Sequence, residues 1–159
     1  MQSLSQSAVA HDAERVLELI ERQQSLAQEL EHLAMQQSHL IEQSETSALL
    51  DLLAKRQGVI DSLLAAQGEM RTVAPRLERA ELSDSLRSRL NALIDDVSRR
   101  LEVVMAVDER DKASLRVERD AVRTELSAAG TAQQARNAYL SRGQAAAQPV
   151  GNRFSDHKG

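Results

Sequence analysis

The chain has no cysteine and no tryptophan, one phenylalanine, one tyrosine, two prolines and six glycines among its 159 residues. The lack of cysteine excludes disulfides and thiol chemistry. The near absence of aromatic side chains argues against a wide globular core, a β-sandwich or an α/β sheet. What remains is rich in Ala, Leu, Gln, Glu and Arg, the residues that lose least on entering a helix. The composition therefore predicts a nearly all-helical protein with small aliphatic core contacts.

Acidic and basic residues are nearly equal in number, so the charge does not indicate a polyanionic partner. The net charge is −4 and the pI is about 5.6, which gives no electrostatic basis for binding nucleic acid or an anionic membrane surface. Residues 1–15 lack the basic and apolar regions of a signal peptide, and the longest strongly apolar run, 103–107, is too short to cross a bilayer. We therefore expect a cytoplasmic protein without membrane insertion.

Three segments carry apolar residues at the three- and four-residue spacing of a helix that buries one face. The first is expected from about residue 8 to 44, and its apolar seam consists of Val16, Leu19, Leu26, Leu30, Leu33 and Leu40. The second should end just before Pro75, because the residue preceding a proline is disfavoured in the α conformation. The third is expected to begin near 82–85 and to stop at Gly130. Serine and threonine at 44–47 interrupt a helix only weakly, so the sequence leaves open whether the first two helices are separate.

Two glutamines, Gln23 and Gln37, stand at positions of the apolar stripe of the first helix. A polar group at such a position tolerates only partners that satisfy it. The glutamines are therefore predicted to weaken the helical seam and to set its register.

These patterns predict an all-α fold, an elongated antiparallel helical hairpin or three-helix bundle of long helices with a disordered C-terminal tail. The helical, coiled-coil-like domain is expected over residues 1–130. Residues 131–159 carry few large apolar side chains and cannot offset the entropy of ordering, so they are predicted to form a flexible tail.

The third helix changes character over residues 108–126, which include eleven charged residues. Its apolar stripe narrows there to Leu115, Val117, Val122 and Leu126. Two interpretations stay open. The segment is a solvated helix held by opposite-charge neighbours, or it overhangs the bundle and keeps a narrow apolar stripe for a partner.

No constellation of residues indicates catalysis or a cofactor. His32 and His39 are two helical turns apart, too far to converge on one metal ion. The carboxylates at 95–96 and 108–111 have neighbouring Arg or Lys residues and no calcium-loop glycine. There is also no phosphate-binding loop and no nucleophile in a strand–turn–helix context. We expect no enzymatic activity, no metal and no cofactor, which leaves helix-mediated protein binding.

Residues 15–105 combine a long first helix, a short polar step and a second helix that carries Leu49, Leu52, Arg56 and Ile60 in the spacing Leu-x-x-Leu-x-x-x-Arg-x-x-x-Ile. In this pattern the segment has a resemblance to the FlgN-type flagellar export chaperones. It implies a small, acidic, cytoplasmic chaperone for flagellar type III export. Such a chaperone binds hook–filament junction (hook-associated) proteins before secretion, through its C-terminal helical region, and delivers them to the export apparatus.

An amphipathic helix can cover the apolar coiled-coil segments of a secreted subunit by the helix-in-groove mode. The tail contains Phe154, the single phenylalanine of the chain, with charged residues nearby. This segment is either a docking motif or part of a solubilising extension. The predicted partner-binding residues are Leu115, Val122, Leu126, Tyr139, Arg153 and Phe154.

A second class of function stays open, a structural coiled-coil protein that forms homo-oligomers through the first and third helices and has no client. The discriminating property is whether self-association covers the apolar stripe. A tight oligomer favours the structural protein, whereas a monomer or weak dimer that is stabilised by a partner favours the chaperone.

Overall fold

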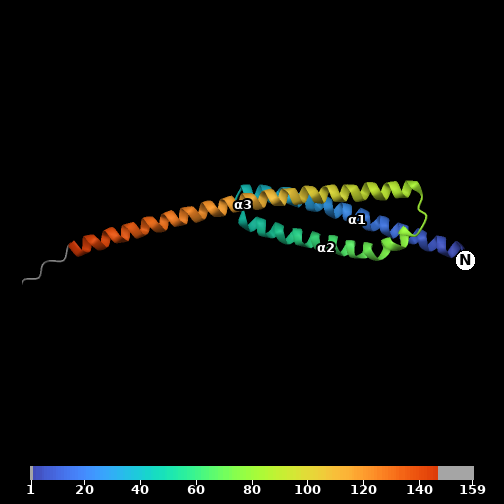
Figure 1. Cartoon of the computed structure of the whole chain (residues 1–159), viewed down its shortest axis with the longest axis horizontal. Coiled ribbons are helices and arrows are strands. Elements are labelled where there is room, and N and C mark those ends of the chain that lie inside the picture. Colours follow the sequence, from blue (N-terminus) through green and yellow to red (C-terminus); the bar gives the residue numbers. More distant parts are fainter. Residues whose placement is uncertain (1, 147–159) are drawn as a thin grey trace, which may run out of the picture. The chain divides into compact units, whose positions relative to one another are not determined.

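The computed structural model describes residues 2–146, with side chains described as far as residue 143. Throughout this range the chain is α-helical apart from two short connections, which confirms the predicted all-α fold (Figure 1). The three helices are α1 (Gln2–Glu42), α2 (Thr46–Glu78) and α3 (Asp84–Ala146).

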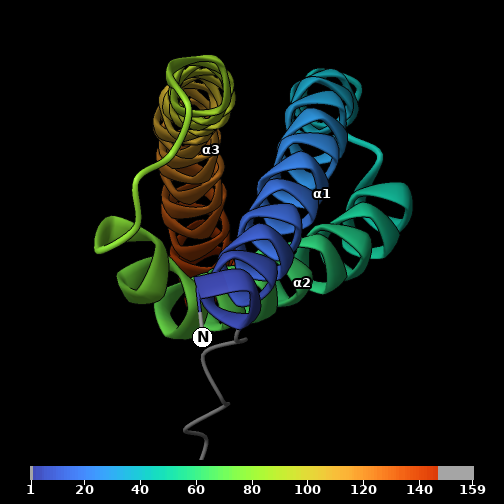
Figure 2. The same ribbon diagram turned by 90° about the vertical axis from the view of Figure 1, so that its right-hand side faces the viewer.

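The chain divides into two compact units. The first, Met1–Leu115, contains α1, α2 and the first part of α3, and the second, Arg116–Gly159, contains the rest of α3. Figure 2 shows the three helices of the first unit placed around a shared interior rather than in one layer. This unit is the three-helix bundle that the apolar spacing predicts.

Helix α1 ends in a tight turn and does not continue into α2. Ser44 has a φ of 56°, in the left-handed region. The Glu45 N–H donates to the Leu40 carbonyl at 3.0 Å, and the Ser44 N–H donates to the Ile41 carbonyl at 3.0 Å. This pair of bonds is the Schellman motif, which satisfies carbonyl groups at the end of a helix. The first two helices are therefore separate.

Helix α2 continues through Pro75, so the predicted end before this proline is wrong. Proline removes a backbone donor and strains the preceding turn, and Figure 1 shows α2 curving over its last turns. Val73 and Leu77, on either side of Pro75, are both buried. They pack in one cluster with Val16 and Leu90. Burial of these two side chains offsets the lost hydrogen bond, and the helix extends to Glu78.

Helices α1 and α3 run parallel. Side-chain hydrogen bonds join them at several points along their length, and in four of these pairs the partners are separated by 68, 72, 69 and 73 residues. A nearly constant separation requires parallel helices, so α2 returns antiparallel to both (Figure 1). The four pairs are Glu21–Arg89, Gln24–Asp96, Glu31–Arg100 and Ser38–Asp111.

The core of the first unit is aliphatic and lies in two clusters along the bundle. Most of the predicted seam of α1 is buried, including Leu19, which is 1% exposed. In α2, Leu53 and Leu64 share the helical spacing of apolar residues that predicts one buried face, but they are 43% and 60% exposed and lie outside the core. One cluster contains Ala13, Val16, Ile20, Val73, Leu77 and Leu90, and the other contains Leu30, Leu33, Ala34, Leu52, Val59, Val104 and Val107.

Helix α3 does not stop at Gly130 but continues to Ala146, so the predicted stop is wrong. One glycine inside a helix costs only about 1 kcal/mol, and the following residues are rich in the helix formers Ala, Gln and Arg. A side-chain bond spans this point, from the Thr131 hydroxyl to the Ser127 carbonyl at 2.9 Å, and Gln133 donates to Asn137 at 3.3 Å just beyond it. Residues 131–146 are thus helical, while the tail from residue 147 onward lies outside the described residues.

Candidate partner-binding surface

From residue 112 onward, α3 carries large apolar side chains that no described part of the chain covers. Every side chain described from residue 112 to 143 is exposed. Leu115, Val122 and Leu126 are 42%, 54% and 68% exposed, and Tyr139 is 79% exposed. Leu140, at 54%, was not among the predicted residues although its spacing could have identified it. The other two predicted residues, Arg153 and Phe154, lie outside the described residues.

Helical spacing sorts these residues into one stripe and two outliers. Val122 follows Leu115 by seven positions, Leu126 follows by four more, and Leu140 follows Val122 by eighteen, about five helical turns. These four residues keep the repeat of a helix that packs along one side, and we call them the α3 stripe. Tyr139 borders the stripe. Val117 is rotated by roughly 200° from Leu115 and so belongs to another face.

Opposite-charge neighbours do little to hold this part of α3 together. Among the described side chains of residues 112–143 there is one ion pair, between Arg119 and Asp120 at 3.6 Å. Both of its side chains are more than half exposed. Thr124 and Ser141 return hydrogen bonds to carbonyls one turn earlier, at 2.9 Å each. Such contacts satisfy polar groups of the helix but leave its apolar stripe in water.

A buried polar network joins all three helices of the first unit. Gln37 of α1, predicted to be a polar seam residue that sets register, is 6% exposed. Its amide donates to Asp111 at 2.9 Å, and its carbonyl accepts a hydrogen bond from Arg56 of α2. Ser38 donates to the same Asp111 carboxylate at 2.8 Å. Gln23, the other predicted seam glutamine, is instead half-buried and lines a groove.

Arg56, one of the residues of the second helix that carry the family resemblance, is the cation of this network. It is 7% exposed, and its Nη1 and Nη2 donate to Asp108 Oδ1 and Oδ2 at 2.8 Å each. Sequence reasoning assigned the neutralisation of Asp108 to neighbouring basic residues, whereas its partner comes from another helix. The available signal was a charged residue, Arg56, at an apolar position of α2.

The network holds the helices of the first unit together. Arg56, Gln37 and Ser38 engage the carboxylates of Asp108 and Asp111. Within residues 2–146, no three His, Asp or Glu side chains gather in a way that could hold a metal ion. The arrangement is that of a structural contact, since each carboxylate is occupied by donors of the same chain.

A second polar contact perturbs the ionisation of Asp96 on α3. Gln24 of α1 donates to its Oδ2 at 2.9 Å, and Arg100 donates from the same helix, also at 2.9 Å. Arg99 adds a further hydrogen bond. The bond from Gln24, followed by that from Arg100, lowers the pKa of Asp96 to about 2. The negative charge of Asp96 therefore helps to dock α3 on α1.

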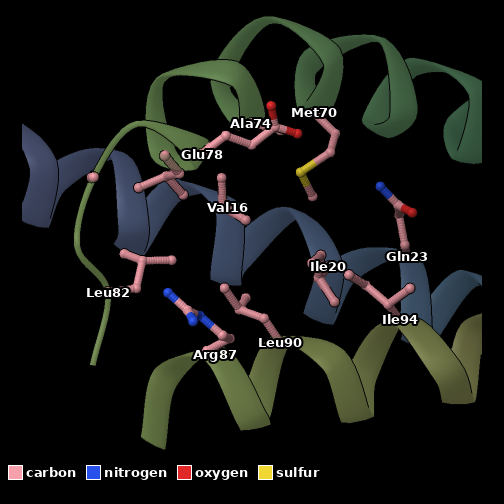
Figure 3. Close-up of a pocket in the computed structure, with 12 residues that line it drawn as sticks. Val16, Ile20, Gln23, Met70, Ala74, Glu78, Leu82, Arg87, Leu90 and Ile94 are labelled. Carbon is pink, nitrogen blue, oxygen red and sulfur yellow. The ribbon is translucent and has the colours of Figure 1, made fainter. Parts of the chain in front are cut away.

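An open apolar groove of about 450 Å³ lies in the first unit (Figure 3). Figure 3 shows α1 as its floor, with Val16 and Ile20, between α2 and the beginning of α3. Met70, Leu90 and Ile94 line its sides, and Glu78 and Arg87 are its charged members. This lining can hold an aliphatic group, and its charged side chains are exposed.

None of the helices in residues 2–146 combines the length and the apolarity needed to cross a membrane. Comparison with protein-family models, with curated proteins and with solved structures finds no match to the chain.

Proposed function

We propose that the chain is a cytoplasmic protein-binding chaperone that covers an apolar helical segment of a client with the α3 stripe. The observation that carries this proposal is the exposure of four large apolar side chains, Leu115, Val122, Leu126 and Leu140, at helical spacing. Apolar stripes of this kind are typical of surfaces that bind an amphipathic helix. The proposed activity is binding alone, without catalysis and without a cofactor.

The proposed clients are hook-associated flagellar proteins, which the chaperone would bind before secretion and deliver to the type III export apparatus. Support for this specific client comes from the resemblance of residues 15–105 to FlgN-type chaperones, including Arg56 in the second helix. The client must present an apolar helical face, since the α3 stripe consists of aliphatic side chains. Its flanks should be mixed in charge, because α3 carries both Glu and Arg beside the stripe.

The test is co-expression of the full chain with candidate hook-associated proteins, followed by size exclusion with mass detection. A stoichiometric complex is expected. The double variant Val122→Asp with Leu126→Asp should lose the complex while its helix content and thermal unfolding stay unchanged, because both side chains are exposed.

A matched double variant, Val117→Asp with Thr124→Asp, places the same two charges on another face of α3 and should retain the complex. Equal binding by both double variants would refute a client site on the stripe. Absence of a complex with every hook-associated candidate would refute the flagellar assignment, and a tight self-oligomer in the same experiment would instead support a structural coiled-coil protein without a client.

A further inference from the structure

The α3 stripe belongs to a longer seven-residue repeat. Starting at Leu115, alternating steps of four and three residues pass through every member of the stripe. Positions spaced in this way form the contact line of a two-stranded coiled coil. We call this line the α3 seam, and it consists of Leu115, Arg119, Val122, Leu126, Ala129, Gln133, Arg136 and Leu140.

Between Leu115 and Leu126, the residues that flank the α3 seam are charged, with one sign on each side. Glu118 and Glu125 each precede a seam residue on one side, and Arg116 and Arg123 each follow a seam residue on the other. All four side chains are exposed. Among the described contacts, none of these four forms an ion pair within the chain.

The order of these charges selects one orientation of a second helix. In a parallel coiled coil, a residue before a seam position faces the residue about five places further along the partner helix. Glu118 of one chain then meets Arg123 of an identical chain, and two-fold symmetry repeats the contact. An antiparallel pair brings like flanks together, so it forms no such Glu–Arg contacts.

We infer that the α3 seam is a homodimer interface on which a second copy of this chain packs in parallel and in register, with reciprocal Glu118–Arg123 ion pairs. The occupant is identified by charge complementarity of the sequence with itself. Arg119, Gln133 and Arg136 place polar groups in the seam, which keeps the dimer weak and exchangeable. A second copy and a client use the same stripe and so exclude each other, but the homodimer does not depend on the proposed function.

Cysteine cross-linking tests the orientation directly, because the natural chain has no cysteine and an introduced thiol is the only one present. In a parallel dimer, Leu140→Cys should oxidise to a disulfide-linked dimer of the full chain. Ala138→Cys, two positions away and off the seam, should remain monomeric under the same conditions. In an antiparallel dimer, Leu140 instead faces Leu115, so a mixture of Leu115→Cys and Leu140→Cys chains would form mixed dimers.

Predominant mixed dimers, or equal cross-linking of the Leu140→Cys and Ala138→Cys variants, would overturn the inference. The ion pair is tested separately by light scattering over a concentration series. Glu118→Arg should shift the monomer–dimer transition to higher concentration, and adding Arg123→Glu should shift it back. A double variant no better than Glu118→Arg alone would exclude the reciprocal pair. Neither experiment contains a client, so failure here and failure of the chaperone proposal are distinguishable.

Discussion

Arg56 of α2 and Asp108 of α3 form a two-point ion pair, with Nη1–Oδ1 and Nη2–Oδ2 distances of 2.8 Å each. The Arg56 side chain is 8% exposed and that of Asp108 is 40% exposed. The planar guanidinium matches both carboxylate oxygens, which gives the contact directional specificity. Since Arg56 also donates to Gln37, this one side chain connects all three helices of the first unit.

A double-mutant cycle measures this connection. We expect Arg56→Ala and Asp108→Ala each to lower the free energy of unfolding, because each leaves polar partners unpaired. The double variant should be less destabilised than the sum of the two, with a coupling energy of about 1–3 kcal/mol. Urea unfolding followed by circular dichroism supplies the four values.

The matched control is the exposed pair Arg89–Glu21, in which the side chains are 60% and 46% exposed at 2.7 Å. Solvent screening should keep its coupling below about 1 kcal/mol. A coupling for Arg56–Asp108 no larger than this control would mean that burial of Arg56 does not strengthen the pair.

The left-handed conformation of Ser44 predicts a stabilising substitution. Glycine has no Cβ to strain at this φ, so Ser44→Gly should raise the free energy of unfolding by about 0.5–1 kcal/mol. The same exchange in the interior of α3, Ser98→Gly, should lower it by about 0.5 kcal/mol. Denaturant midpoints of the two variants must move in opposite directions, and a lower midpoint for Ser44→Gly would contradict the Schellman turn.

Asp96 predicts a pH dependence of stability. Its pKa in the folded chain is about 2, below the value of about 3.9 for an unfolded chain. Its charge therefore stabilises the fold fully above the unfolded value, and this contribution is lost as pH falls through the folded pKa. The stability difference between the natural protein and Asp96→Asn should be constant at neutral pH and shrink from about pH 4 to about pH 2.

Thermal unfolding over this pH range tests the effect of Asp96. Asp95→Asn alters the adjacent, exposed carboxylate and is the control. It should leave the pH profile close to that of the natural protein. If the two variants give the same profile, the contact with Gln24 does not determine the ionisation of Asp96.

Leucines of the core and of the stripe should respond differently to truncation. Leu19→Ala removes a side chain that is 1% exposed and should cost about 2–5 kcal/mol. Leu126→Ala, at a position 68% exposed, should cost less than about 0.5 kcal/mol in dilute protein. Denaturant titration at low concentration compares them, and a similar loss in both would show that the stripe is covered within a single chain.

The open groove beside Met70 has room for a larger side chain than the one now present at Ala74. Ala74 lines it, so Ala74→Leu should bury additional apolar surface and raise the free energy of unfolding by about 1 kcal/mol. Ala65→Leu makes the same change at an exposed site of α2 and should have little effect. Equal melting temperatures for the two variants would indicate that the groove closes in solution.

Local patterns of the sequence were sufficient to predict that the chain forms three helices and which face of α1 is mostly buried. Spacing of apolar residues predicted Leu19 and Leu33 as buried, because each helix packs only one face. Helix ends were less predictable. Pro75 and Gly130 are unfavourable inside a helix by only a few kcal/mol at most, and in the first case burial of Val73 and Leu77 outweighs the local preference.

The polar contacts of the bundle could not be predicted, because they depend on which helices meet. Gln37 was identified as a seam residue from its position, but its partners Arg56 and Asp111 lie 19 and 74 residues away. Sequence neighbours suggested a local partner for Asp108. The pairing with Arg56 requires the antiparallel alignment of α2 and α3, which no local pattern contains.

The parallel pairing of α1 and α3 has a consequence for how the chain folds. The α1–α2 hairpin closes through a turn of three residues, 43–45, so its contacts form at little cost in loop entropy. Contacts between α1 and α3 must wait until about seventy intervening residues are in place, and contacts this distant in sequence form slowly. During synthesis the α1–α2 hairpin is therefore complete first, and α3 packs last onto this preformed pair of helices. Gln37 is then already positioned to donate its hydrogen bond to Asp111.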